Sequence, residues 1–205
     1  MGDTRRHPSM SVLPPIIDSL PEAESPDGDV LSEPFLATCR LVLPVFDRLG
    51  VAFAPAKSDV SGNIERLAKR AGAHTKLFDI CLEEVAAGTQ ASNSGCCKGL
   101  LWLKRFLEFT MALLRALEEE PRTRAMKDCA NDAYARCLKP YHGWISSSAF
   151  SVVMSFPPSR RDFVNSLGGE GAYGDIGRLT AGFSPVLAKI HQFLVDNGLD
   201  DPTKV

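Results

Sequence analysis

Apolar residues return every three or four positions along most of this chain, and this spacing limits the folds that it can adopt. The segment from Leu31 shows the pattern first, with Phe35, Cys39, Val42 and Phe46 on one helical face and Gly50 at its end. Strict alternation of apolar and polar residues never continues beyond four positions, so no strand is predicted. The sequence therefore predicts an all-α protein with seven or eight helices.

The helices expected beyond this first segment each carry an apolar stripe, and most end close to a glycine, a proline or an asparagine. They are predicted at 59–72, 74–87, 96–119, 121–138, 141–154, 159–167 and 174–196. Ser58 is the expected N-cap of the 59–72 helix. Residues 1–30 carry five prolines among polar residues, and we expect a loosely ordered lead-in there, with one short turn around Ile16–Leu20. Residues 31–205 are predicted to form a single domain.

Composition excludes several functional classes. The 23 basic and 25 acidic residues leave a net charge of −2, which does not favour nucleic acid as a partner. The first 30 residues contain no continuous apolar stretch of the kind found in secretion signals. The six cysteines contain no CxxC pair, and we interpret them as reduced, mostly buried thiols. These features predict a cytoplasmic location.

Two polar stripes lie on predicted helices that are otherwise largely apolar. Asp59, Asn63 and Arg66 are spaced i, i+4 and i+7, which places them within about 60° of one another around the helix axis. Asp59 is expected in the first turn, where the helix dipole favours a carboxylate. By itself this stripe is more typical of a solvated helix face. The second stripe, Lys98, Trp102 and Arg105, has the same spacing and would by itself indicate boundary packing.

His142 lies in the segment Tyr141-His142-Gly143-Trp144, where a lone histidine is more often a helix cap or a core residue. Taken together, a carboxylate, a carboxamide, a guanidinium, an indole and an imidazole on apolar helices indicate a polar mouth above an apolar interior. The set is a poor match for catalysis, because no Ser-His-Asp spacing, G-x-S-x-G motif, Walker loop or helical pair of zinc-binding histidines accompanies it. No enzyme activity, metal or cofactor is predicted.

Several segments, in the same order and spacing, closely resemble the glycolipid transfer protein family. They are Leu43-Pro44-Val45-Phe46-Asp47-Arg48-Leu49-Gly50, Lys57-Ser58-Asp59-Val60-Ser61-Gly62-Asn63-Ile64, Trp102-Leu103-Lys104-Arg105 and Lys139-Pro140-Tyr141-His142-Gly143-Trp144. The resemblance covers about residues 31–200. Gly99-Leu100-Leu101-Trp102 and Trp144-Ile145-Ser146-Ser147 look most similar to plant-type members.

This resemblance implies an eight-helix, two-layer sandwich that encloses an apolar lipid pocket. It also implies non-enzymatic transfer or sensing of glycosphingolipids, a glycosylceramide ligand, transient peripheral contact with membranes, and a monomer. A lipid needs such a carrier to leave a membrane, because exposing its hydrocarbon chains to water costs about 0.8 kcal/mol per CH₂.

The resemblance also assigns expected roles to individual residues. Asp59 would accept hydrogen bonds from the ceramide amide and a sugar hydroxyl, and His142 would donate to the ceramide carbonyl. Asn63 and Arg66 would contact sugar hydroxyls, and the first sugar ring would stack on Trp102. Trp144 would lie at the membrane-docking surface.

Two departures from the family pattern bear on the ligand. Lys98 lies one turn before Trp102, where sugar-selective relatives have an apolar or neutral residue and the ceramide-1-phosphate branch has a basic one. The alternative is therefore a carrier of an anionic sphingolipid, such as ceramide-1-phosphate or sulfatide. In addition, Thr203 lies near the C-terminus, where animal members have a tyrosine that clamps the headgroup.

Overall fold

The computed structural model describes residues 11–119, 122–153 and 157–204, and within these ranges it is entirely helical apart from turns and two isolated β-bridges. The α-helices of these ranges are α1 (Leu13–Ser19), α2 (Ser32–Asp47), α3 (Ala54–Ala71), α4 (Leu77–Ala86), α5 (Cys96–Glu118), α6 (Met126–Cys137), α7 (Trp144–Val153), α8 (Arg160–Leu167) and α9 (Ala172–Asp196). Short 3₁₀ helices lie at Leu20–Ala23, Val51–Phe53, Lys139–Tyr141 and Gly169–Gly171. The all-α prediction is confirmed, although the described ranges contain nine α-helices rather than the seven or eight expected.

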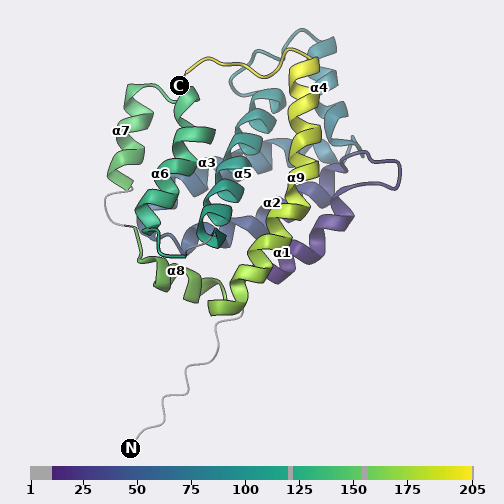
Figure 1. Cartoon of the computed structure of the whole chain (residues 1–205). Coiled ribbons are helices and arrows are strands. Elements are labelled where there is room, and N and C mark those ends of the chain that lie inside the picture. Colours follow the sequence, from purple (N-terminus) through teal and green to yellow (C-terminus); the bar gives the residue numbers. More distant parts are fainter. Residues whose placement is uncertain (1–10, 120–121, 154–156, 205) are drawn as a thin grey trace, which may run out of the picture.

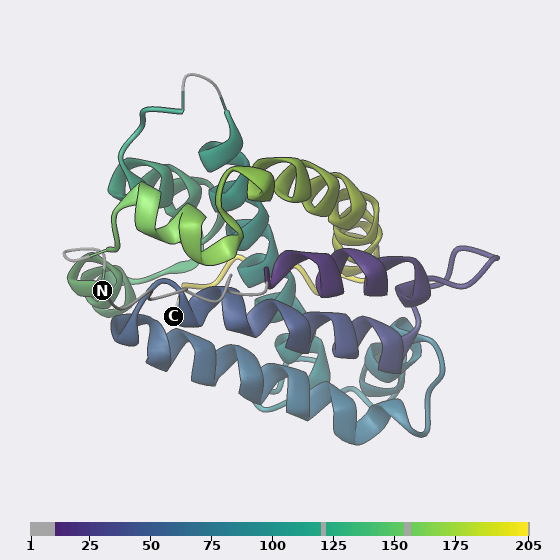
Figure 2. The same cartoon turned by 90° about the horizontal axis from the view of Figure 1, so that it is seen from below.

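Helix α5 forms the centre of the molecule (Figure 1) and packs against α3, α4, α6 and α9. Its side chains are buried on nearly every side, as expected for a helix whose apolar residues extend around most of its circumference. Figure 2 shows α2 and α3 side by side on one face of the molecule, with α8 and α9 toward the opposite face. This is the two-layer helical arrangement that the resemblance implied.

Helix α1 and the 3₁₀ helix after it replace the short turn that was expected around Ile16–Leu20. Leu13 and Ile16 of α1, together with Leu20 and Ala23 of the 3₁₀ helix, are buried, and α1 packs against α2 and α9. The expectation of loose order is therefore wrong for residues 13–23. Prolines are tolerated in the first turn of a helix, because the N–H groups there have no intrahelical partner. The single-domain assignment of residues 31–205 stays a prediction, and residues 1–10 lie outside the described ranges.

Helix α3 begins earlier than predicted. It starts at Ala54, with Pro55 in its first turn, so Ser58 is inside the helix and does not cap it. Asp59 consequently lies in the second turn rather than the first. The dipole argument for a carboxylate at this position therefore does not apply, and the reason for Asp59 must be sought in what its side chain faces.

The start of α5 is stabilised by a side chain of α4. The carboxylate of Glu84 accepts hydrogen bonds from the backbone N–H groups of Cys96 (2.6 Å) and Cys97 (2.9 Å), which serves the purpose of a side-chain N-cap. Gly95 is required beside this contact, because a Cβ atom there would lie 2.8 Å from a Glu84 carboxylate oxygen. This contact fixes the first turn of α5, which carries Lys98.

Candidate functional site

A cavity of about 540 Å³ lies between α3, α5 and α7, within the volume range of small-molecule sites. Its apolar lining comprises Phe46, Ala52, Phe53, Pro55, Ala56, Phe106, Phe109, Leu138, Ala149, Phe150 and Val153. Its polar and amphipathic lining comprises Asp59, Asn63, Arg66, Asn93, Lys98, Trp102, His142 and Ser146. The six residues predicted to bind a headgroup therefore share one cavity, although they come from three separate segments of the chain.

On α3, Asp59 and Asn63 point into this cavity from successive turns. Asn63 is buried, whereas Asp59 is exposed. The Asn63 side-chain amide donates a long hydrogen bond of 3.5 Å to the Asp59 carboxylate. A carboxylate held this loosely keeps most of its acceptor capacity for a ligand. The stripe is therefore more than a solvated helix face, and its contacts with a ligand stay a prediction.

Arg66 has a structural task in addition to lining the cavity. Its Nη1 donates hydrogen bonds of 3.2 Å to the backbone carbonyls of both Asn93 and Gly95, in the loop before α5. Gly99 permits this path, because a Cβ atom there would come within 3.3 Å of the Arg66 side chain. Part of the donor capacity that we assigned to sugar hydroxyls is thus used within the protein.

His142 is oriented by a tyrosine of α6. Its Nδ1 lies 3.1 Å from the Tyr134 hydroxyl, which is also 3.2 Å from the Ser147 hydroxyl. Because Tyr134 occupies Nδ1, Nε2 is the ring nitrogen left to meet a ligand. Burial, aided by the nearby Arg105 charge, lowers the pKa of His142 below its ordinary value, and the Asp59 charge opposes the shift. The imidazole is therefore neutral at neutral pH.

This lowered pKa predicts a pH-dependent stability. Since the unfolded chain binds a proton at His142 more readily, the free energy of unfolding should fall as the pH drops below about 6.5. Urea unfolding at about pH 7 and pH 5 should show a smaller loss in His142→Gln than in the wild type. If the free energy of unfolding falls equally in the two proteins, His142 is not the source of this pH dependence.

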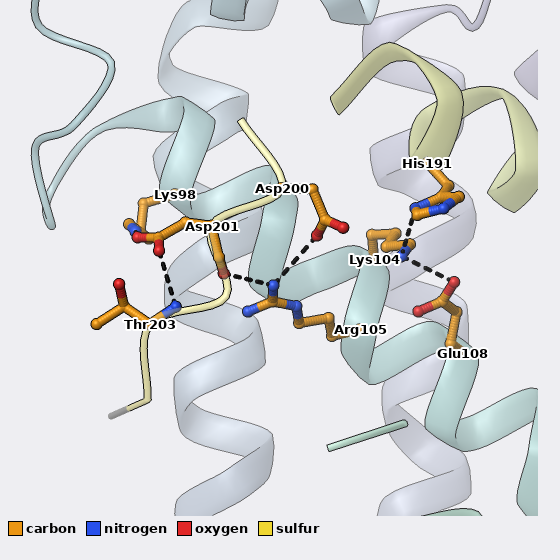
Figure 3. Close-up of polar contacts among 8 residues, drawn as sticks. All are labelled: Lys98, Lys104, Arg105, Glu108, His191, Asp200, Asp201 and Thr203. Carbon is orange, nitrogen blue, oxygen red and sulfur yellow. Dashed lines mark hydrogen bonds and ion pairs between the residues drawn. The ribbon is translucent and has the colours of Figure 1, made fainter. Parts of the chain in front are cut away.

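Lys104 and Arg105 are sequence neighbours that point in different directions (Figure 3). The Lys104 ammonium is buried against α9, 3.0 Å from the Glu108 carboxylate and 3.1 Å from Nδ1 of His191. Arg105 is 1% exposed and points toward the C-terminal segment. Lys104 therefore joins two helices, whereas Arg105 belongs to the surroundings of the cavity.

Arg105 was not among the predicted site residues, yet it joins the cavity wall to the chain end. Its Nη2 donates to the Asp200 carboxylate at 3.2 Å and to the Asp201 carbonyl at 2.7 Å. Its guanidinium carbon lies 3.4 Å from the centre of the Tyr141 ring and 5.1 Å from that of Trp102, so it makes cation–π contacts with both. The sequence carried a signal, because an arginine on a largely buried helix requires partners.

Lys98 is paired with the C-terminal segment. Its ammonium lies 2.5 Å from the Asp201 carboxylate, and its side chain is 16% exposed (Figure 3). The Lys98 hydrogen bond, followed by those from Thr203, holds the pKa of Asp201 well below its usual range. The sequence did not single out this carboxylate, which lies 103 positions from Lys98 along the chain.

Other parts of the structure bear on the remaining predictions. The side chain of Trp144, predicted to dock on membranes, lies outside the described residues, so its role stays a prediction. In the described ranges, no three His, Cys, Asp or Glu side chains are grouped to hold a metal ion.

Nor does any helix in those ranges combine the length and apolar character needed to cross a bilayer. Cysteines pack mostly in the core, with only Cys137 partly exposed.

Comparison with known sequences identifies relatives over most of the chain. Residues 30–169 match the family model described as glycolipid transfer protein. Glycolipid transfer protein 1 of Arabidopsis thaliana is 35% identical over 196 residues, covering 93% of this chain and 96% of the relative. Glycolipid transfer protein 2 of the same plant is 33% identical over 175 residues, covering 81% and 78%.

Comparison with solved structures identifies the same fold. A structure that explains how FAPP2 selects simple glycosphingolipids using this fold superposes with a TM-score of 0.86 at 27% identity, covering 95% of this chain and 100% of that one. The apo form of mouse ceramide-1-phosphate transfer protein superposes with a TM-score of 0.85 at 20% identity, covering 93% and 98%. The second likeness concerns the fold alone.

Proposed function

The chain belongs to the glycolipid transfer protein family, and on that premise we propose that it carries glycosphingolipids between membranes without chemical change. The observation that supports this most is the shared cavity, in which six polar or amphipathic side chains accompany a wall rich in phenylalanine. Such a cavity replaces the bilayer around hydrocarbon while its polar groups bind the headgroup.

The proposed arrangement assigns one task to each part of the cavity. Asp59 accepts from the ceramide amide and a sugar hydroxyl, and His142 donates to the ceramide carbonyl through Nε2, in the tautomer whose Nδ1 accepts from the Tyr134 hydroxyl. Trp102 supports the first sugar ring, while Asn63 and Arg66 meet hydroxyl groups. The hydrocarbon chains lie along the apolar wall, where each buried CH₂ contributes about 0.8 kcal/mol.

A neutral headgroup fits the charges of the site better than an anionic one. Arg66 already donates to two backbone carbonyls, and Lys98 is paired with Asp201. An anionic sphingolipid, such as ceramide-1-phosphate or sulfatide, remains the second candidate because both cations line the cavity. For this ligand to bind well, at least one of the two cations would have to change partners.

A vesicle-to-vesicle transfer assay tests the proposal directly. Donor vesicles would contain labelled glucosylceramide, sulfatide or ceramide-1-phosphate, and the recovered lipid would be checked for reaction products. We expect glucosylceramide to move fastest and to be recovered unchanged. Faster transfer of the anionic lipids would favour the second candidate, and new products would contradict a non-enzymatic carrier.

We further propose that the rim of the cavity docks on membranes transiently. Val51 and Val152 are 94% and 72% exposed, and each is adjacent in sequence to residues that line the cavity. Exposed apolar side chains at the rim of a lipid site are suited to the bilayer interface. We also infer that the protein acts as a monomer on the cytoplasmic face of membranes.

Val51→Asp combined with Val152→Asp should therefore reduce the fraction of protein that co-sediments with vesicles by several-fold. Binding of a short-chain, water-dispersed glycosylceramide should change little. Val195→Asp on α9 is the matched control, because Val195 is also exposed but does not line the cavity. If the double variant sediments like the control, the docking surface lies elsewhere.

A further inference from the structure

The C-terminal segment places a carboxylate, that of Asp201, against a lysine that lines the candidate headgroup site. We propose that Asp201 is a specificity-determining residue that occupies Lys98 and thereby disfavours anionic headgroups. This inference deepens the proposed function and rests on it. It is carried by the ion pair of 2.5 Å between the two side chains, and by the position of Lys98 in the wall of the cavity.

Asp201 is held in place by contacts that do not depend on Lys98. Its backbone carbonyl accepts a hydrogen bond of 2.7 Å from buried Arg105, and its second carboxylate oxygen accepts one of 2.8 Å from the backbone N–H of Thr203. The adjacent Asp200 is also bound to Arg105. Figure 3 shows that Arg105 of α5 binds the segment at both Asp200 and Asp201, next to the Lys98 contact. The carboxylate is therefore pre-positioned rather than recruited by the lysine.

The pair changes what the site offers to a ligand. A lone lysine beside Trp102 would attract phosphate or sulfate through charge-assisted hydrogen bonds. With Asp201 in contact, an incoming anion must either displace this carboxylate or bind close to it, and both are unfavourable for like charges. A sugar hydroxyl meets no such obstacle, because it donates to Asp201 or accepts from a free Lys98 N–H while the pair stays intact.

The two side chains are also partly shielded from water, which strengthens the effect. Lys98 is 16% exposed and Asp201 is 36% exposed at the side chain. Charges at such a site are screened less by salt than charges on an open surface. The third carboxylate of the region, Asp59, also lines the cavity and adds to the repulsion of an anion. Lys98 should thus attract an anionic headgroup less strongly than an unpaired basic residue at the same position would.

The test uses the full-length protein and the ratio of ceramide-1-phosphate transfer to glucosylceramide transfer. Asp201→Asn should raise this ratio about tenfold, because it frees the lysine and removes a negative charge, and tenfold corresponds to about 1.4 kcal/mol. Adding Lys98→Leu should abolish the gain. Asp132→Asn is the matched control, since it makes the same change in net charge at an exposed ion pair with Arg124, away from the cavity.

Lys98→Met provides a second, independent variant. It leaves the Asp201 carboxylate without its cation beside the cavity, and so should lower the ratio below that of the wild type. If the wild type transfers glucosylceramide but neither variant changes the ratio relative to Asp132→Asn, the inference is overturned and the proposed function stands. If the wild type transfers neither lipid, the proposed function fails and the inference fails with it.

Discussion

Asp59→Val is expected to reduce glucosylceramide transfer by roughly 10- to 150-fold while leaving the fold intact. Losing a charge-assisted hydrogen-bond acceptor costs about 1.5–3 kcal/mol, which gives this range. Asp59 is exposed in the second turn of α3, and its contact with Asn63 is long. Its removal should therefore cost little in stability, and the loss should appear almost entirely in lipid binding.

The measurement combines initial transfer rates with circular dichroism and a thermal melt. Glu65→Val is the matched control, because Glu65 is another exposed carboxylate of α3 and its partner is Arg40. The control should transfer at close to the wild-type rate. If Asp59→Val also transfers at that rate, the headgroup site does not include this carboxylate.

Arg105→Ala is expected to lower the free energy of unfolding by about 3–5 kcal/mol, a large share of the stability of a domain. The change leaves Asp200 without its cation and the Asp201 carbonyl without its donor. It also removes the cation that lies 3.4 Å from the Tyr141 ring. Since Asp200 keeps some contact with water, the lower half of this range is the closer expectation.

Urea unfolding gives this value, with Arg115→Ala as the matched control. Arg115 is an exposed arginine on the same helix, and truncating it should change stability by no more than about 0.5 kcal/mol. Proteolysis of the C-terminal segment in the native state supplies a second readout, because Arg105→Ala should release residues 199–204. A loss of stability below 1 kcal/mol would contradict the role that we assign to this side chain.

The elements of the fold that could be predicted from sequence are those specified by neighbouring residues. The apolar spacing over 96–119 predicted α5 almost to the residue, and Gly50 marked the end of α2 with its positive φ of 103°. The spacing of Asp59, Asn63 and Arg66 placed them on one face. These successes share a cause, because helix periodicity and the conformational freedom of glycine act over only a few residues.

The errors arose where local signals conflicted. Five prolines suggested loose order before residue 31, whereas Leu13 and Ile16 are buried against α2 and α9. Ser58 looked like a cap, but α3 begins at Ala54, with Pro55 in its first turn. In both cases prolines lie in the first turn of the observed helix, where they are tolerated.

The sequence alone determined the helical class, the family and six of the eight polar or amphipathic residues of the cavity wall, with Asn93 and Ser146 unpredicted. The tertiary structure alone decided which protein groups those residues contact. Lys98 and Asp201 are separated by 103 positions, and no periodicity connects them. The ion pair exists because Arg105 fastens the chain end to α5. Whether a lysine is a free cation or a neutralised one depends on which groups share its space, and only the packing of distant segments specifies that.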